Sequence, residues 1–522
     1  MKFSVRTAKL QKRVHTATRF AKKIFIPSYF IMYIKSGWAD KQSKICSFSE
    51  NNSPIIRPYH KKVVTLQPET STNIRYMKKR LFLMALVAMA ITTAHAGGLM
   101  TNTNYHIAFD RMMARGATFD IDAAFSNPAG LAWGHEGWQL SLNFQKPWQH
   151  RDIQLVTPVA QRYEGVASAP IVPALFASYK HNRWALSAMI GIVGSGGFVK
   201  YDAGVPMFNV VLAGMFTQKG ITPDQYTLES EMKGKQYIYG GQLNFTYRVL
   251  DCLAASAGMR ANYYDGYYRG RVVASNHPML GDLAAMRLDV DQRGWGYTPV
   301  VSLDYHQGPL TLAARYEFRT KINVPNTTNI LEAGLGDKVT ALLMQTDPAS
   351  LQTIAQTLGA KTQAYQDGEY TRYDMPALLS VAAGYAFEDN VRATLEYHFF
   401  DDKHARMASN RQEALTHGTH EFLAGVEGDV NDKLTLSCGM QRTDYGLSDD
   451  YQQNTSFTCD SWSFGLGCAI NLTKQLRLNA GYFITIYDNY TKECNAARDG
   501  YNGKEVYSRT NNVIGLGIDY KF

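Results

Sequence analysis

Two groups of ionisable side chains have the types that catalysis or metal binding would need. In the first, His398 lies two residues from Glu396, so both would point to the same side of a strand, as a paired base and acid must. The sequence places no identifiable nucleophile beside them, and a lone histidine facing a polar interior is typical of a hydrogen-bonding partner. We therefore expect no enzyme activity.

The second group surrounds one predicted loop and consists of Asp401, Asp402, His404, His417 and His420. Contact with a metal or a haem is one interpretation of this group, and a solvated polar loop is the other. The spacing matches no strong ligand pattern. We therefore expect no metal site and no cofactor.

The cysteines give no metal signature either. None of those that follow residue 96 forms a C-x-x-C or a zinc-type spacing. Cys459 and Cys494 fall near the outer ends of neighbouring predicted strands, so an oxidising compartment would permit a disulfide between them. Sequence spacing leaves both the bridged and the free state open.

Residues 77–96 indicate the compartment. They read MKKRLFLMALVAMAITTAHA, in which three basic residues precede a short apolar run and a small-x-small motif ends it. We interpret this stretch as a secretory signal peptide, cleaved between Ala96 and Gly97. Because such signals are read from the N-terminus, residues 1–76 are interpreted as an upstream extension caused by a misassigned start. A genuine extended leader is the alternative.

Removing this leader reverses the charge of the chain. The whole chain has 54 Lys and Arg against 45 Asp and Glu, a formal net charge of +9, but 18 of the basic and 3 of the acidic residues fall in residues 1–96. The remaining 36 basic and 42 acidic residues give −6. The basic balance that would favour a nucleic-acid partner therefore disappears, and we expect none.

From Trp138 onward, apolar residues recur at every second position in short segments, which predicts strands. The opposite face carries mainly Gly, Ser, Asn and Thr, and Trp and Tyr gather near strand ends, as in a barrel with a polar lumen. The predicted fold is all-β, a closed antiparallel transmembrane barrel over residues 137–522. About fourteen strands are expected, at 137–149, 171–181, 183–199, 235–249, 252–272, 293–306, 310–325, 374–387, 390–401, 417–430, 432–445, 456–472, 474–489 and 510–522.

Tight turns and long loops alternate between these strands, which places both termini on the periplasmic side of an outer membrane. The last strand should pair with the first, and Phe522 is expected to be the signal read by the barrel-assembly machinery. Two loops are unusual: residues 200–234 are strongly apolar, and residues 326–373 contain two predicted short helices, near Asp337–Met344 and Ala349–Leu358.

Residues 97–136 precede the first strand and contain the sequence GATFDIDAAFSNPAGL, with Asn127, Pro128 and Ala129 near its end. This stretch resembles the hatch segment of the FadL/TodX family of outer-membrane hydrophobic-compound transporters. Strand sequences at Pro309–Tyr316 with Arg319–Lys321, and at Met375–Ala377 with Gly384 and Tyr385, are also similar to the family. The resemblance implies a hatch that plugs the lumen, a monomer in outer-membrane lipid, and passive uptake of hydrophobic compounds such as long-chain fatty acids.

The resemblance also implies a kink in the third strand through which ligand leaves sideways. The family often has a Pro-Phe-Gly-like sequence there, whereas this chain has Gly194, Ser195, Gly196 and Gly197, and glycines can supply a kink or bulge. Asn127 is expected to bond backbone exposed at that kink.

The expected ligand path begins in an apolar groove between the two unusual loops. The groove residues are Met207, Phe208, Val211, Leu212, Met215, Phe216, Leu331, Leu335, Val339, Leu342 and Leu343. A carboxylate head group would want a lumenal cation, and the candidates are Arg260, Arg315, Arg319 and Lys321. The alternative for these charges is an internal ion-pair network.

Two other functions remain open at this point. A general diffusion porin would have the same strands but an open channel, and a structural or haem-binding outer-membrane barrel would need neither the kink nor the groove. The sequence does not identify the ligand.

Overall fold

The strands form a closed ring. The computed structural model describes residues 99–102, 104–169, 171–387 and 390–522, and within this part of the chain fourteen antiparallel strands pair in sequence order, with the last closing on the first. These strands are β1 (Gly137–Thr157), β3 (Val172–His181), β4 (Trp184–Tyr201), β5 (Thr227–Leu250), β6 (Leu253–Ser275), β7 (Ala284–Gln307), β8 (Leu310–Glu317), β11 (Leu378–Phe387), β12 (Val391–Phe400), β13 (Thr419–Asn431), β14 (Leu434–Asp444), β15 (Ser461–Asn471), β16 (Leu476–Tyr487) and β18 (Gly503–Lys521). The predicted barrel and its strand number are confirmed. The predicted extension, signal peptide and cleavage site lie outside the described residues.

β1 shows why these residues form a membrane barrel. Leu140, Leu142 and Phe144 are 40–43% exposed on its outer face, whereas Gln139 and Asn143 on the inner face are buried. This is the reverse of a soluble sheet, whose apolar face is covered. An apolar outer face and a polar inner face suit a strand between lipid and a polar lumen.

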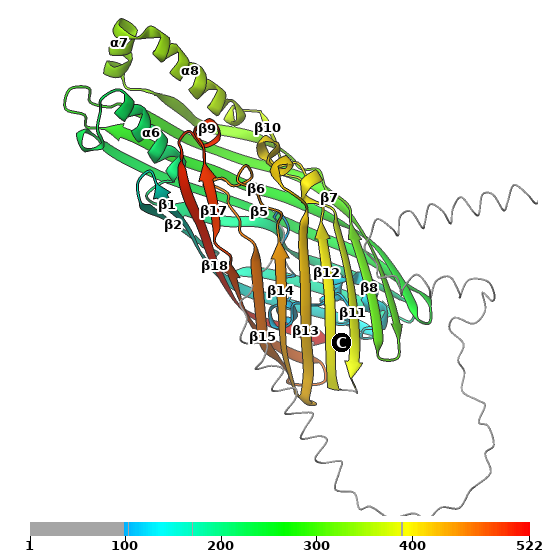
Figure 1. The fold of residues 1–522 in the computed structure, drawn as a ribbon. Helices are drawn as coiled ribbons and strands as arrows, with labels where there is room; N and C mark the ends of the chain where they lie inside the picture. Colours follow the sequence, from blue (N-terminus) through cyan, green and yellow to red (C-terminus); the bar gives the residue numbers. More distant parts are fainter. Residues whose placement is uncertain (1–98, 103, 170, 388–389) are drawn as a thin grey trace, which may run out of the picture. The chain divides into compact units, whose positions relative to one another are not determined.

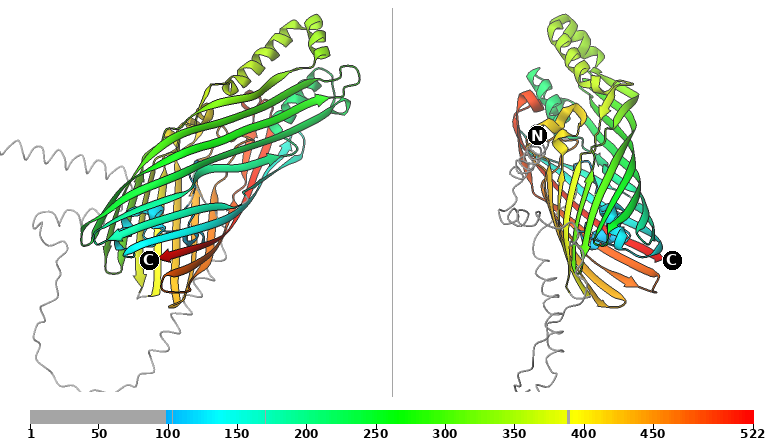
Figure 2. Two further views of the ribbon diagram at one scale, coloured as in Figure 1. Left: turned by 180° about the vertical axis from the view of Figure 1, so that it is seen from behind. Right: turned by 90° about the vertical axis from the view of Figure 1, so that its right-hand side faces the viewer.

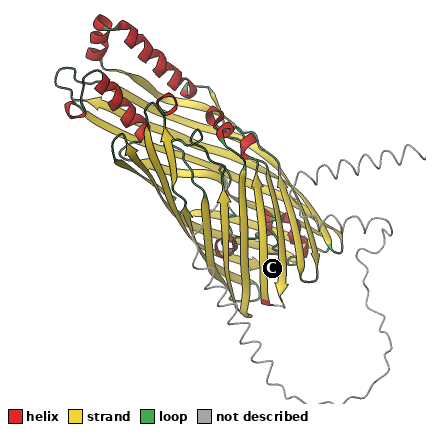
Figure 3. Cartoon of the chain, viewed as in Figure 1, coloured by secondary structure: helices red, strands yellow, loops and turns green. Residues whose placement is uncertain are grey.

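The ring has two different ends (Figures 1 and 2). At the turn end, short connections join β3 to β4, β5 to β6, β7 to β8, β11 to β12, β13 to β14 and β15 to β16, and Phe522 donates its backbone N–H to the carbonyl of Trp138 over 3.0 Å. At the loop end lie the helices α6 (Pro206–Gln218), α7 (Asp337–Thr346) and α8 (Pro348–Thr362), drawn red in Figure 3. No helix in the described ranges is both long and apolar enough to cross a membrane.

Several elements extend beyond the predicted boundaries at the loop end. β1 ends 8 residues later than expected, β5 and β7 begin 8 and 9 residues earlier, and β6 ends 3 residues later. The expected strand 310–325 ends at Glu317 in β8, and the chain then forms β9 (Asn323–Leu335). The other short elements are β2 (Gln161–Ser168), β10 (Tyr370–Arg372), β17 (Tyr490–Cys494), α9 (Ala496–Asp499) and the 3₁₀ turns η2 (Pro223–Gln225), η3 (Gln363–Tyr365), η5 (Asp402–His404) and η6 (Ala408–Ala414).

Residues 99–136, called the N-terminal segment below, lie inside the ring. This segment contains α4 (Ile107–Arg111), α5 (Ala123–Ser126) and η1 (Pro128–Trp133). α4 contacts β14, β15, β16, β18 and β1 on one side of the barrel, and η1 contacts β4 to β7 on another. The segment therefore crosses the interior.

Glycines in the wall make room for α4. A Cβ at Gly465 would lie 2.3 Å from the carbonyl oxygen of Asp110, which is backbone and cannot rotate away. The same close approach to the N-terminal segment recurs on this strand at Gly467 and on other strands at Gly425, Gly439, Gly481 and Gly515. The small residues on the inner face therefore form the surface against which this segment packs, and they also line a polar lumen.

Candidate functional site

The Asn-Pro-Ala sequence joins the N-terminal segment to β5 and β7 through hydrogen bonds. The Asn127 side-chain amide donates to Asp304 Oδ2 over 2.9 Å, the Pro128 carbonyl accepts from Thr246 over 2.9 Å, and the Ala129 N–H donates to Ser302 Oγ over 3.0 Å. The expectation that Asn127 bonds backbone at the third-strand kink is wrong, because its partners are on β7.

Buried ion pairs hold the rest of the segment. Arg115 donates to both carboxylate oxygens of Asp122 at 2.8 Å, and Arg111 pairs with Glu427 on β13. His106 lies 3.0 Å from Asp519 on β18. The Arg115–Asp122 pair lies within the segment, whereas the contacts with Glu427 and Asp519 join it to the wall. Because buried charges are costly without partners, the contacts with the wall give the segment one position in the lumen. The predicted plugging of the channel remains a prediction.

The third transmembrane strand, β4, is irregular where the glycines were noted. Its register with β5 shifts between Ile192 and Gly194 and again between Gly194 and Gly197, and Gly197 has a φ of +74°. On the other side of β4, the ladder with β3 ends at Ile190 and the ladder with β2 begins at Val199. The segment 191–198 therefore lies between two ladders, at an interruption of the barrel wall.

The start of the N-terminal segment runs along the inside of this interruption. The Asn102 N–H donates to the carbonyl of Val193 over 3.0 Å. A Cβ on Gly194 would lie 2.3 Å from the carbonyl oxygen of Met100, so only glycine permits this approach. The bulged backbone is thus contacted by residues 100–102, which sequence reasoning missed.

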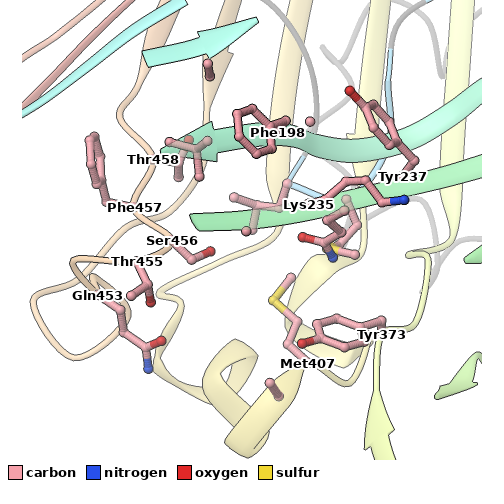
Figure 4. Close-up of a pocket in the computed structure, with 18 of the residues that line it drawn as sticks. Phe198, Lys235, Tyr237, Tyr373, Met407, Gln453, Thr455, Ser456, Phe457 and Thr458 are labelled. Carbon is pink, nitrogen blue, oxygen red and sulfur yellow. The ribbon is translucent and has the colours of Figure 1, made fainter. Parts of the chain in front are cut away.

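Above the N-terminal segment, at the level of this interruption, the barrel contains a cavity of about 630 Å³, called the main cavity below. Ile192 and Phe198 of the bulged strand line it together with Leu99 and Met100. Its other walls come from the outer loops and upper strands; Figure 4 shows Phe198, Lys235 and Tyr237 facing Gln453, Thr455, Ser456, Phe457 and Thr458, with Tyr373 and Met407 on a further side. The volume falls in the ~300–1,000 Å³ range of small-molecule sites.

The main cavity is also rich in cations. Its lining includes Arg151, Lys235, Arg372, Arg406, Arg411 and Arg509, against Glu369 as the one carboxylate among the described lining residues. None of these cations was predicted. Arg151 and Arg509 lie just outside the predicted strands, and Arg406 and Arg411 lie in a predicted loop, so no alternation was available to show which way they face.

The predicted head-group cations are elsewhere. Arg260 and Arg315 are buried and both pair with Glu317, beside a space of about 40 Å³ that holds little more than water. Arg319 and Lys321 are exposed, so the expectation that they face the lumen is wrong. They fall after β8 has ended, where strand alternation no longer applies.

The predicted groove residues do not line a single groove. Leu212 and Phe216 of α6 pack in one apolar cluster with Leu335 and Val339, so the two loops do touch. Val211 and Met215 line a groove of about 1,210 Å³ between α6, the outer ends of β1 and β5, and β2, whereas Leu331 and Leu335 line a space of about 520 Å³ beside α7 and α8. Phe208 packs with Val211 against a second cluster, Leu343 is half-buried, and Met207 and Leu342 are exposed.

Both candidate disulfide cysteines are free. Cys459 and Cys494 belong to one apolar cluster, but Cys459 contacts the carbonyl of Tyr507 and Cys494 contacts the hydroxyl of Tyr501. Burial raises the pKa of each thiol to about 12, which disfavours the thiolate that disulfide exchange requires.

His398 is held between two glutamates, at 2.7 Å from Glu396 and 2.9 Å from Glu421. The nearby Ser380 hydroxyl donates to Glu396 over 3.0 Å and not to the imidazole. A serine activated as a nucleophile would instead bond the histidine. Glu396 also accepts the N–H of Gly116 over 2.7 Å, so this group anchors the N-terminal segment.

The side chains of the predicted acidic and histidine loop do not converge. His404 pairs with Asp401 at 2.5 Å, His417 lies 3.7 Å from Asp444, and His420 bonds the hydroxyl of Tyr397. In the described residues no group of His, Cys, Asp and Glu has the arrangement of a metal site.

Comparisons with known proteins agree on the fold. Residues 344–522 match the family model described as an outer membrane protein beta-barrel domain. The structure is similar to that of a Pseudomonas aeruginosa FadL homologue, at 15% identity over 82% of this chain and 100% of that chain, with a TM-score of 0.59. It is also similar to the Pseudomonas putida toluene transporter TodX, at 12% identity over 82% of this chain and 100% of that chain, with a TM-score of 0.53. No curated protein matches the sequence.

These similarities establish an outer-membrane β-barrel with the fold seen in the FadL homologue and TodX. The resemblance drawn from the Asn-Pro-Ala region is confirmed at the level of the fold.

Proposed function

We propose that this outer-membrane barrel carries out passive uptake of hydrophobic small molecules, which enter the main cavity from the loop end and leave sideways through the interruption at β4. The single observation that carries the proposal is that the bulged segment of β4 forms part of the cavity wall, through Ile192 and Phe198. The two similar structures, a FadL homologue and a toluene transporter, support the same class of function.

The composition of the lumen favours a sideways exit. Toward the turn end, an apolar molecule would have to pass the buried side chains of Arg111, Arg115, Asp122 and Glu427. Opening these pairs would leave buried charges without partners, at a cost of about 3–5 kcal/mol for each broken pair. Through the wall, the same molecule meets lipid, where burial contributes ~0.8 kcal/mol per methylene.

Capture is assigned to the loop end. The groove along α6 presents Val211 and Met215, and methionine suits varied apolar ligands because its side chain repacks. We include long-chain fatty acids in the substrate class, together with smaller apolar molecules.

The proposal also covers orientation and assembly. We propose that both termini lie in the periplasm and that the barrel-assembly machinery recognises Phe522.

Straightening β4 tests the exit. Deleting Ser195 and Gly196 removes as many residues as the two bulges add, and it preserves the alternation of the flanking side chains. In cells that lack other carriers, uptake of radiolabelled oleate or toluene should fall to the background of cells without the barrel. The amount of folded barrel in the outer membrane, measured by heat-modifiable gel migration, is the control. Full uptake by a folded deletion variant would exclude this exit.

A further inference from the structure

Three arginines meet on one wall of the main cavity. Arg151 on β1 and Arg509 on β18 are direct partners in the strand register, and Arg411 comes from η6. All three donate to consecutive residues of the loop 456–458. The contacts are Arg411 to the carbonyl of Ser456, Arg151 Nη2 to the carbonyl of Phe457 at 2.6 Å, and Arg509 Nη1 to Thr458 Oγ1 at 3.2 Å.

The charge of this group, called the arginine triad below, is not balanced by the chain. The hydrogen-bond acceptors that the described residues offer to the three guanidiniums are all neutral oxygens, from carbonyl, hydroxyl and amide groups. The Nε atoms of Arg151 and Arg509 are buried and have no hydrogen-bond partner in the described structure. Like charges opposite each other on paired strands are destabilising, so the site favours an anion. Arg260 and Arg315 differ, because Glu317 pairs with both.

Aromatic rings fix the planes of the triad. Arg411 lies 4.0 Å from the ring centre of Tyr451, Arg509 lies 4.3 Å from that of Tyr487, and Arg151 lies 5.0 Å from that of Phe457. Cation–π contact restricts each guanidinium before any ligand arrives. A site ordered in advance loses less entropy on binding.

We propose that the arginine triad binds a phosphate monoester head group, carried by an amphiphile whose apolar chain lies in the main cavity. A phosphate monoester carries about −1.5 to −2 charges at neutral pH and has three acceptor oxygens, which suits three guanidiniums. A carboxylate would neutralise one charge and leave two. Met100, Ile192 and Phe198 line the same cavity and accept the apolar chain. This inference rests on the proposed uptake of hydrophobic molecules and narrows its substrate class.

The test is isothermal titration calorimetry on the purified full-length barrel in a nonionic detergent at pH 7.4. Four probes separate head group from chain: oleoyl lysophosphatidic acid, oleate, monoolein and inorganic phosphate. Lysophosphatidic acid should bind at least about tenfold more tightly than oleate, as expected when further charge-assisted hydrogen bonds are made. Arg151→Gln and Arg509→Gln should each remove most of that difference and leave monoolein binding unchanged.

Arg162→Gln is the matched control, because Arg162 is an exposed cation on β2, in the sheet that carries Arg151. It should leave all four affinities as they are. Arg411→Gln gives a second route should the strand variants fail to fold, because Arg411 lies in a loop turn.

The outcomes separate the two proposals. Equal affinity for lysophosphatidic acid and oleate would overturn the phosphate site and leave the uptake function standing. Inorganic phosphate binding as tightly as lysophosphatidic acid would overturn the assignment to an amphiphile. Failure of all three amphiphiles to bind would contradict the proposed function itself.

Discussion

Asn127 joins the N-terminal segment to the barrel wall through one side-chain amide. It is buried and donates to Asp304 over 2.9 Å, and the other oxygen of Asp304 accepts from Trp133 over 2.8 Å. Asn127→Ala would leave a buried carboxylate oxygen without its donor, at a cost of about 1–3 kcal/mol. We expect a lower thermal unfolding temperature for the purified barrel. Asn329→Ala, at an exposed asparagine with contacts of 3.4 Å, should not change it.

Asp402 makes the stability of the folded outer loops depend on pH. Burial, with a smaller contribution from the nearby Glu421 and Asp401 carboxylates, raises the pKa of Asp402 from an ordinary value of 3.8 to about 7. The folded state binds the Asp402 proton more tightly than the unfolded state. The contribution of protonated Asp402 to the free energy of unfolding is therefore full below about pH 4 and is lost as the pH rises to about 7. The total loss is at most about 4 kcal/mol.

Asp402→Asn removes this ionisation. Denaturant unfolding of the wild-type barrel should show stability falling between pH 4 and 7, and the variant should lose that part of the decline. Asp401→Asn changes a more exposed neighbour that pairs with His404, and its profile should keep the decline. An unchanged profile in Asp402→Asn would show that another group titrates in this range.

Some of the site residues could be predicted from the sequence, and others could not because they lie beyond the part of each strand that faces lipid. Strand parity placed Arg260 and Arg315 inside the barrel, and the Asn-Pro-Ala motif marked a true junction. Arg151 and Arg509 were missed although they lie one or two residues beyond predicted strand ends. Above the membrane the outer face is no longer apolar, so alternation stops reporting which face is inside.

Among the elements, the lipid-facing strands were predictable and the outer structure was only partly so. Exposed apolar residues at every second position identify the membrane part of strands such as β1. The two helices predicted in the 326–373 loop are present as α7 and α8, the second preceded by Asp347, whose carboxylate accepts the N–H of Ser350. α6 was predicted only as an apolar loop, because Val, Phe and Met dominate it without a clear polar face.

Glycines on several strands let α4 pack closely against the barrel wall, and a substitution at one of them tests this close packing. Gly465→Ala would place a methyl group 2.3 Å from the carbonyl oxygen of Asp110. The helix must then move, so we expect a higher single-channel conductance in planar bilayers. Gly241→Ala on β5 adds the same methyl group where nothing lies within 4 Å, and its conductance should match the wild type. A wild-type conductance in a folded Gly465→Ala barrel would argue against tight seating.

For the whole barrel, the N-terminal segment divides the lumen into two parts of different character. Toward the turn end, buried ion pairs such as Arg115 with Asp122 surround a space of about 40 Å³. Toward the loop end, aromatic and apolar residues and several cations, among them the arginine triad, surround about 630 Å³, which borders the interruption at β4. An amphiphile is suited to the upper part and excluded from the lower part, which is the physical basis for a sideways exit.

Deleting residues 99–127 tests this division. The ring closes through β1 and β18 without the segment, so a folded barrel is expected, and gel migration checks it. Removal of α4 and of the contacts that Arg111 and His106 make with Glu427 and Asp519 would join the upper and lower lumen. We expect ion conductance in planar bilayers to rise several-fold over the full-length barrel. Equal conductance in the two proteins would mean that the segment does not close the channel, and the general diffusion porin would then be the better interpretation.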